Sequence, residues 1–282
     1  MERGVFMQEN IKNKNHTIHH TQRKNKAARR KLQRLKKRLL ILGVLLVILA
    51  AVNQRIFLPG NLRLPAVIGM NQERTLKEEG VPQSLIDLYE RNKEARQFVL
   101  DYEKNKDKHE AIDISKEVRD GEIPLFLQWD ERWGYETYGD DYMAVTGCGP
   151  TALSMVYTGL TGDTSLNPYE MAKLAQNNGY YVNGSGSSWN MMLGLASQIG
   201  LDANEISLDE NSIKKELSAG NPIICIMGPG DFTTSGHFIV LTGITDDGKV
   251  QVNDPNSVKN SQKTWELDRI MSQMRDLWVY KA

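Results

Sequence analysis

Cys148 lies in a sequence context that favours an ionised, nucleophilic thiol. It stands in the segment T-G-C-G-P-T, and the apolar residues after it recur at three- and four-residue steps. Because Pro150 is tolerated only in the first turn of a helix, we expect a helix to begin within a residue or two of Cys148. The free N–H groups and the positive dipole end of that helix favour thiolate over thiol. The alternative is a small buried cysteine at a tight turn, and this segment alone fits both.

His237 and Asp254 could activate this thiol. His237 opens the apolar segment H-F-I-V-L-T-G-I, which is typical of a strand, and a D-D-G turn then leads into K-V-Q-V-N-D-P. Two antiparallel strands joined by this turn would bring His237 and Asp254 to the same end of a sheet. Nucleophile, base and orienting carboxylate would then form a catalytic triad. The alternatives are a histidine that belongs to the core and an aspartate that only caps a strand end.

Gln128 adds a fourth polar group upstream of Cys148, in the segment Q-W-D-E-R-W-G. Its amide could donate a hydrogen bond to the oxyanion that forms when a carbonyl is attacked.

Four segments together resemble the C39-like peptidases, a family of the papain-like cysteine peptidase superfamily. They are Q-W-D-x-R-W-G, x-G-C-G-P-T, G-H-F-I-V and N-D-P, and the resemblance covers residues 122–282. It implies a cysteine-type peptidase with Cys148 as nucleophile, His237 as base, Asp254 as the residue that orients His237, and Gln128 as oxyanion donor. The best-known members remove leader peptides after a double glycine, on the cytoplasmic side, as part of a transporter.

The expected substrate is therefore a peptide or protein, although we expect no transporter domain in the same chain. This makes the double-glycine substrate class doubtful for this protein. Two other activities are compatible with the same residues. One is acyl or amide transfer to an acceptor other than water, and the other is peptide binding with little turnover.

Charge is distributed unevenly along the chain. Of the 35 Lys+Arg and 35 Asp+Glu residues, 13 and 2 lie in residues 1–38, so the remainder carries a net charge of −11. An acidic globular part argues against nucleic acid as its partner. The spacing of cysteine and histidine fits no zinc pattern, and we expect no metal and no cofactor.

The N-terminal region predicts a membrane anchor. Residues 1–38 form a basic arm, and residues 39–52 are 14 residues without a polar side chain. Because a spanning helix usually needs about 17–25 residues, we extend the predicted transmembrane segment to residues 39–58. Positive charge before the segment predicts a single-pass protein of the bacterial cell membrane, with a cytoplasmic N-terminus and an extracellular catalytic domain. A cleaved signal peptide is the main alternative, and a buried soluble helix is another.

The remaining residues divide into a stem and a catalytic domain. Residues 59–122 are expected to form a stem with one amphipathic helix over 84–102, capped by Ser84 and Asp87 and packed on the catalytic domain or a partner. Residues 103–120 read as a linker. Residues 123–282 are expected to be an α+β domain in which helices pack on an antiparallel sheet.

Three further positions border the expected site or its core. The glycine–serine segment 184–188 is interpreted as a cleft-rim loop, with Trp189 and Gly147 as candidate substrate-binding residues. A phosphate-binding loop is the alternative, but no strand–loop–lysine context supports it. Cys225, in P-I-I-C-I-M, is expected in a buried strand, and a disulfide with Cys148 is the alternative.

Overall fold

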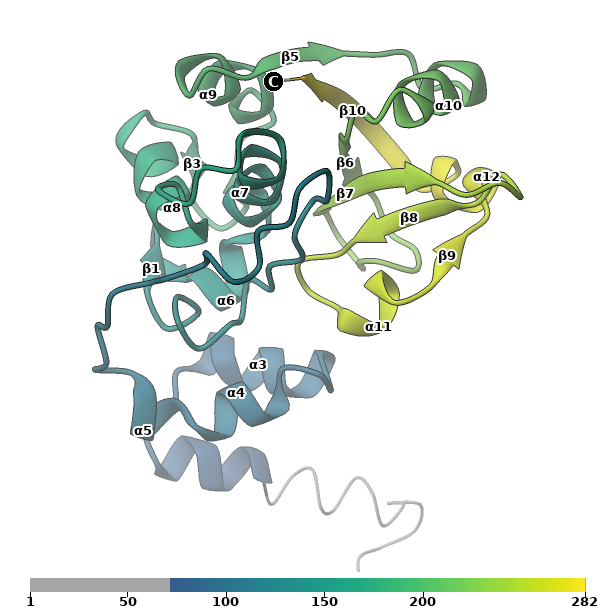
Figure 1. Cartoon of the computed structure of the whole chain (residues 1–282). Helices are drawn as coiled ribbons and strands as arrows, with labels where there is room; N and C mark the ends of the chain where they lie inside the picture. The colour runs from purple at the N-terminus through teal and green to yellow at the C-terminus, as the bar shows by residue number, and fades with distance from the viewer. Residues whose placement is uncertain (1–71, 282) are drawn as a thin grey trace, which may run out of the picture. The chain divides into compact units, whose positions relative to one another are not determined.

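A six-stranded antiparallel sheet is the central element of the computed structural model, which describes residues 72–281. The spatial order is β5-β10-β6-β7-β8-β9, and every neighbouring pair is antiparallel (Figure 1). The strands are β5 (Asp202–Glu205), β6 (Ile223–Met227), β7 (His237–Ile244), β8 (Val250–Asn253), β9 (Thr264–Trp265) and β10 (Met274–Lys281).

The central strands are apolar on both faces because both faces are covered. On β6, Ile224 and Ile226 contribute to one buried cluster, whereas Ile223, Cys225 and Met227 contribute to the other. This alternation is the period-two pattern of a strand. Helices α7 (Cys148–Thr161) and α9 (Met191–Gln198) cover the first face, with α8 (Pro168–Asn177) packed on α7. Helices α10 (Glu210–Ser218) and α12 (Leu267–Met271) cover the second face (Figure 1).

The helix starts follow local chemistry. Oδ1 of Asn167 accepts hydrogen bonds from the backbone N–H groups of Tyr169 and Glu170, both at 3.1 Å, and Pro168 occupies the first helical position of α8. Helix α7 ends at Gly162, whose φ of +70° is the left-handed conformation that glycine adopts without strain.

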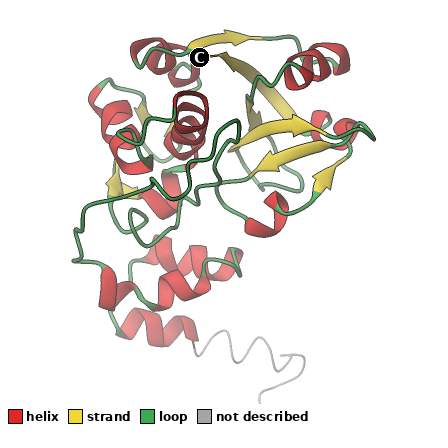
Figure 2. Cartoon of the chain, viewed as in Figure 1, coloured by secondary structure: helices red, strands yellow, loops and turns green. Residues whose placement is uncertain are grey.

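The predicted α+β class with an antiparallel sheet is confirmed, as Figure 2 shows from the distribution of helices and strands. The two edge strands of this sheet, β5 and β9, were not predicted. Strand β5 has the polar sequence D-A-N-E and forms only by pairing with β10 at the edge of the sheet. Helix α12 is short, because β9 ends just before it and β10 begins soon after it.

Residues 72–105 are helical, but the single helix predicted over 84–102 is interrupted. Three helices stand in its place: α3 (Gln83–Arg91), α4 (Arg96–Leu100) and α5 (Tyr102–Asn105). A separate helix over residues 72–78 precedes them. The predicted capping box does not form. Helix α3 follows Pro82, and Oγ of Ser84 instead donates to Oδ1 of Asp141 at 2.7 Å.

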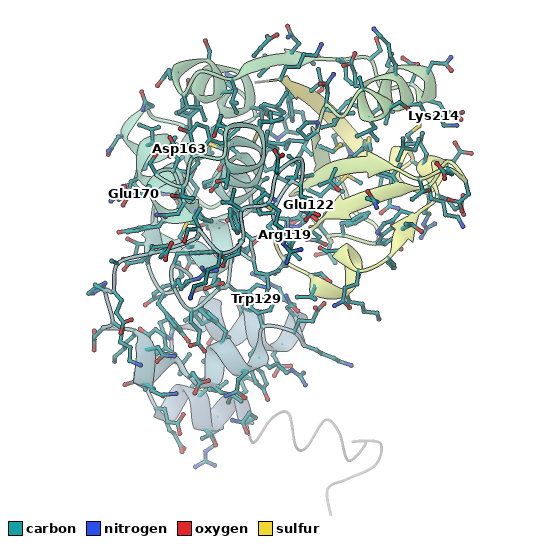
Figure 3. All side chains as sticks on the ribbon, in the orientation of Figure 1. Arg119, Glu122, Trp129, Asp163, Glu170 and Lys214 are labelled. Atoms are coloured by element: carbon teal, nitrogen blue, oxygen red, sulfur yellow. The ribbon has the colours of Figure 1, made fainter. Side chains whose placement is uncertain are left out.

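The apolar stripe of these helices packs on residues 129–145. The rings of Phe98 and Tyr135 stack with centroids 4.1 Å apart, and the Tyr135 hydroxyl donates to the carbonyl of Phe98 at 2.7 Å. Trp129 packs against the same cluster, and Figure 3 shows it beside the α3 and α4 ribbons. The predicted stem helix was expected to pack either on the C-terminal domain or on a partner, and these contacts show the first.

Within residues 72–281, no helix combines the length and the apolar character needed to cross a bilayer. The predicted basic arm at residues 1–38 and the predicted anchor at 39–58 lie outside the described residues.

Candidate active site

Cys148 is the first residue of α7, as predicted from Pro150. Its thiol is half-buried, and the backbone N–H groups of Gly149 and Phe238 contribute to lowering its pKa. Gly149 is required by close packing, because a Cβ at this position would lie 2.5 Å from Oγ of Ser187. The start of the helix and the start of β7 thus converge on the sulfur.

His237 is the first residue of β7 and lies opposite Met227 of β6. Its Nε2 lies 2.7 Å from Oδ1 of Asp254. This leaves Nδ1 as the ring nitrogen available to Cys148, which lines the same hollow as His237. Pairing of Val240 with Asn253 brings His237 and Asp254 to the same end of the β7–β8 hairpin, as the turn predicted.

Asp254 is held by the loop that follows β8. Its Oδ1 also accepts from the backbone N–H of Asn256 at 2.9 Å, and its Oδ2 accepts from Nδ2 of Asn260 at 2.8 Å. Its own N–H donates to Oγ of Ser261 at 2.9 Å. The carboxylate, which is 1% exposed, therefore has hydrogen-bond donors on both oxygens and a fixed direction toward His237.

The contacts of Cys148 and His237 favour charge separation between them. Burial opposes ionisation of Cys148, but the hydrogen bond and charge of His237, with the two backbone donors, lower its pKa below the usual thiol value. Burial disfavours the imidazolium, but the charge and hydrogen bond of Asp254, together with Cys148, raise the pKa of His237 to about 10. Both directions favour a thiolate–imidazolium pair at neutral pH.

Cys225 has the opposite environment. It is fully buried in the cluster on the other face of the sheet, and burial raises the pKa of its thiol. Both cysteines are free, so the disulfide alternative is not observed. The core interpretation of Cys225 is confirmed.

Gln128 lines the same hollow as Cys148, His237 and Asp254. Its side chain is buried, and Nε2 donates to the carbonyl of Ala144 at 2.8 Å and makes a longer contact of 3.4 Å with the carbonyl of Val145. Its Oε1 is buried and has no hydrogen-bond partner among residues 72–281. The amide is thus oriented by the backbone that leads into α7.

Two hollows adjoin the Cys148–His237 pair. One, of about 360 Å³, extends toward Asp254 and Gln128, and the other, of about 650 Å³, extends toward residues 184–189. Trp189 lines the larger hollow and is 45% exposed, as expected for a rim residue. Gly147 lines neither hollow, because it is buried and the place of a Cβ is filled by Met143.

Several residues of the site were not predicted. Asn256 and Asn260 hold Asp254, and residues of α3 and the α3–α4 turn line the hollows: Arg91, Asn92 and Glu94. No motif marks them, because they come from a helix end and from a loop 164 residues further along the chain.

The model of the Peptidase_C39 like family matches residues 121–282. The chain belongs to this family. Among solved structures, it is similar to the peptidase domain of Streptococcus ComA, a bifunctional ABC transporter involved in a quorum-sensing pathway. The identity is 21% and the TM-score 0.37, over 48% of this chain and 89% of that domain. No curated protein matches the chain.

Membership in the C39-like family suggests a cysteine peptidase-like function. The match begins at residue 121, so the helices over residues 72–105 precede it although they line the candidate site.

Proposed function

We propose that the protein is a cysteine peptidase that uses Cys148, His237 and Asp254 to hydrolyse peptide bonds. The observation that supports this most directly is the position of His237, whose imidazole bonds to Asp254 through Nε2 and lines the same hollow as Cys148, so that Nδ1 is left for the thiol. This is the arrangement needed to activate a thiol and then to deliver a proton to a leaving group.

In this mechanism the Cys148 thiolate attacks the carbonyl carbon of the scissile peptide bond. The Nδ1–H of the imidazolium then protonates the leaving amine as the C–N bond breaks, which leaves an acyl group on the sulfur. His237 next accepts a proton from water, which attacks the thioester and releases the carboxylate product. Asp254 keeps the ring in one orientation and stabilises the imidazolium through its hydrogen bond to Nε2.

The oxyanion of the tetrahedral intermediate is proposed to bind between the backbone N–H of Cys148 and Nε2 of Gln128. One N–H of the Gln128 amide bonds firmly to the Ala144 carbonyl, and the second makes only the 3.4 Å contact with Val145. We assign the second N–H to the oxyanion. The firm bond to Ala144 would keep the amide in place during the reaction.

We further propose that the catalytic part lies outside the cytoplasmic membrane and is anchored by residues 39–58. This proposal is supported by the sequence, in which 13 Lys+Arg precede an apolar segment and the residues beyond are acidic.

The activity is tested with full-length protein and a peptide library whose products are read by mass spectrometry. New termini should appear with the wild type and the Cys225→Ala variant and be absent with Cys148→Ala. Conjugates that form only when an amine acceptor is added would indicate acyl transfer as the activity instead of hydrolysis. Saturable binding without any new termini would indicate a peptide-binding module and would contradict the proposal.

A further inference from the structure

The turn between α3 and α4 reaches the loop that carries Asp254, although it precedes the region that matches the family. Nδ2 of Asn92 donates to the backbone carbonyl of Asn256 at 2.8 Å and lies 2.9 Å from Oδ1 of the same residue. Oε1 of Glu94 accepts from Oγ of Ser257 at 2.6 Å, and its Oε2 accepts from the backbone N–H of Lys259 at 3.1 Å. Two side chains therefore hold residues 256–259 from outside the hairpin.

The residues that are held are the ones that position Asp254. The backbone N–H of Asn256 donates to Oδ1 of Asp254. Oγ of Ser257 accepts from the backbone N–H of Asn260, and Nδ2 of Asn260 donates to Oδ2 of Asp254. A displacement of Ser257 would thus move the donors on both carboxylate oxygens of Asp254.

The turn itself is rigidly placed. Oδ1 of Asn92 accepts from the backbone N–H of Glu94 at 2.9 Å, and Ala95 and Phe98 are buried in the cluster that includes Tyr135. Because both ends of the connection are anchored in packed parts of the unit, the hydrogen bonds of Asn92 and Glu94 can fix the loop without moving themselves.

We propose that Asn92 and Glu94 are positioning residues for the catalytic site: they fix the Asp254 loop, and through Asp254 they fix the imidazole of His237 against Cys148. Their effect on peptide hydrolysis rests on the proposed function, but their effect on the Cys148 thiol does not. The N-terminal helices are then part of the catalytic unit and one wall of its cleft, rather than a spacer before it.

The test is the pH dependence of Cys148 alkylation by iodoacetamide in the full chain, read at Cys148 by mass spectrometry. Glu94→Ala removes both contacts to residues 257–259, so Asp254 should hold His237 less well. The midpoint for thiolate formation should then rise by roughly one pH unit, because the charge that stabilises the thiolate is weakened. The charged groups that line this hollow besides the triad are Arg91, Glu94 and Asp231, and Asp231 is paired with Arg269.

Three variants make the result specific. Glu94→Gln keeps a carbonyl oxygen that can accept from the backbone N–H of Lys259 and an amide group that can bond to the Ser257 hydroxyl. It should therefore keep most of the wild-type midpoint. Asn92→Ala should shift the midpoint in the same direction as Glu94→Ala. Glu90→Ala, an exposed change near the end of α3, should leave it unchanged.

A folded Glu94→Ala variant with the wild-type alkylation midpoint and only a lower Tm would overturn the proposal. A shifted midpoint supports it even where peptide hydrolysis is undetectable in the wild type. Failure of the peptidase assignment can therefore be distinguished from failure of this proposal. Where hydrolysis is measurable, we expect kcat to fall with KM nearly unchanged, because Asn92 and Glu94 act through Asp254 and not through binding.

A different observation concerns the charge of the larger hollow. Its lining contains two arginines, Arg91 from the end of α3 and Arg275 from β10, and neither Asp nor Glu. Neither guanidinium forms an ion pair with any residue in the described range 72–281, and both side chains are exposed. Both therefore have free N–H donors beside the Cys148–His237 pair.

Arg275 is held by the local backbone. The β10–β6 register shifts between Met274 and Asp276, and the guanidinium lies against Gly228, where a Cβ would be 2.5 Å from its Nε. A glycine at this position lets the guanidinium lie against the end of β6. Arg91 lines both hollows and so stands where they meet.

We infer that this hollow binds a carboxylate of the peptide substrate, contributed either by an Asp or Glu side chain near the scissile bond or by the substrate C-terminus. A planar guanidinium pairs with a carboxylate through two parallel hydrogen bonds, and the free donors of Arg91 and Arg275 meet this requirement. The inference gives the proposed peptidase a substrate class and rests on that function.

A charge-sensitive alkylation separates this inference from the peptidase assignment. Iodoacetate and iodoacetamide react with the same thiolate but differ by one negative charge, so their rate ratio at Cys148 reports the local potential. We expect Arg91→Gln and Arg275→Gln each to lower the ratio of iodoacetate to iodoacetamide by roughly threefold. Added salt should reduce the wild-type ratio, and the control Lys214→Gln on α10 should leave it unchanged.

Peptides that differ at one position identify the source of the carboxylate. Selective cleavage of Asp- or Glu-containing peptides, lost in the two arginine variants, indicates a side-chain carboxylate. Selectivity for free over amidated C-termini indicates the terminal carboxylate. An unchanged alkylation ratio in the double variant would show that the arginines do not act on the site and would overturn the inference.

Discussion

Nε2 of His237 and Oδ1 of Asp254 lie 2.7 Å apart, and both side chains are almost completely shielded from solvent. A short contact between a buried imidazole and a buried carboxylate is stable only when other donors satisfy the carboxylate, as Asn256 and Asn260 do. This pair therefore determines both the orientation of the ring and the ionisation of Cys148.

Substitution of Asp254 should cause graded damage. Asp254→Asn can still orient the ring and should keep part of the rate, with an altered acid limb. Asp254→Ala can neither orient the ring nor stabilise the imidazolium, and it should lower kcat/KM by roughly 10²-fold or more. The measurement is kcat/KM against pH, with circular dichroism as control for folding. A folded Ala variant with wild-type kinetics would show that Asp254 is only a turn residue.

The pH dependence of activity should follow the ion pair. The thiolate–imidazolium pair exists above the lowered pKa of Cys148 and below the pKa of His237, which is about 10. Activity and Cys148 alkylation should therefore appear below the usual thiol pKa, and activity should fall near pH 10. Cys225 serves as internal comparison, because its buried thiol should not react over this range. Equal labelling of both cysteines at neutral pH would contradict the assignment.

Substitution of the two cysteines should have different effects on activity and stability. Cys148→Ala removes the nucleophile and should abolish turnover while the protein stays folded. Cys225→Ala leaves a small cavity in the core and should lower the free energy of unfolding by about 1–3 kcal/mol with little change in kcat. Denaturant titration and steady-state kinetics measure both effects. Similar loss of activity in the two variants would mean that the pair has been misassigned.

Gly149→Ala should damage the site by steric contact. The added Cβ would meet Oγ of Ser187 at 2.5 Å and its Cβ at 2.8 Å, so either the start of α7 or strand β4 (Gly186–Ser187) must move. We expect kcat/KM to fall by at least roughly tenfold, because a misplacement of about 1 Å can cost 10²-fold. Ser187→Gly should restore activity in the double variant. No recovery there would assign the damage to another contact.

The predicted topology can be tested in cells. If residues 39–58 anchor the chain with the N-terminus inside, protease added to intact cells should remove the domain from Gln128 onward and spare residues 1–38. Antibodies against each end follow the two parts. Protection of the whole chain would reverse the predicted orientation, and a mature protein that starts near Val52 would establish a cleaved signal peptide.

The site was predictable from sequence where local rules govern it. Pro150 fixes the start of α7, and the D-D-G turn fixes the hairpin that pairs His237 with Asp254. The interruption of the α3–α4 region was not predictable, because Asn92 leaves the helical conformation where it bonds to Asn256, far away in sequence. Likewise, no pattern of spacing shows that Glu94 and Ser257 meet. Tertiary contacts override local helix preference here.

The hydrogen bonds that link Asn92 and Glu94 to residues 256–259 also affect the expected order of folding. The hydrogen bond between Asn92 and Asn256 spans 164 residues, so it belongs to the most non-local contacts of the unit. We expect contacts of this kind to form late, because the chain must close a long loop before they stabilise it. During synthesis, the α3–α4 segment emerges well before β8 exists, and the catalytic geometry stays incomplete until almost the whole chain has been made. On the proposed function, a nascent chain would be unable to hydrolyse peptides before its own fold is closed.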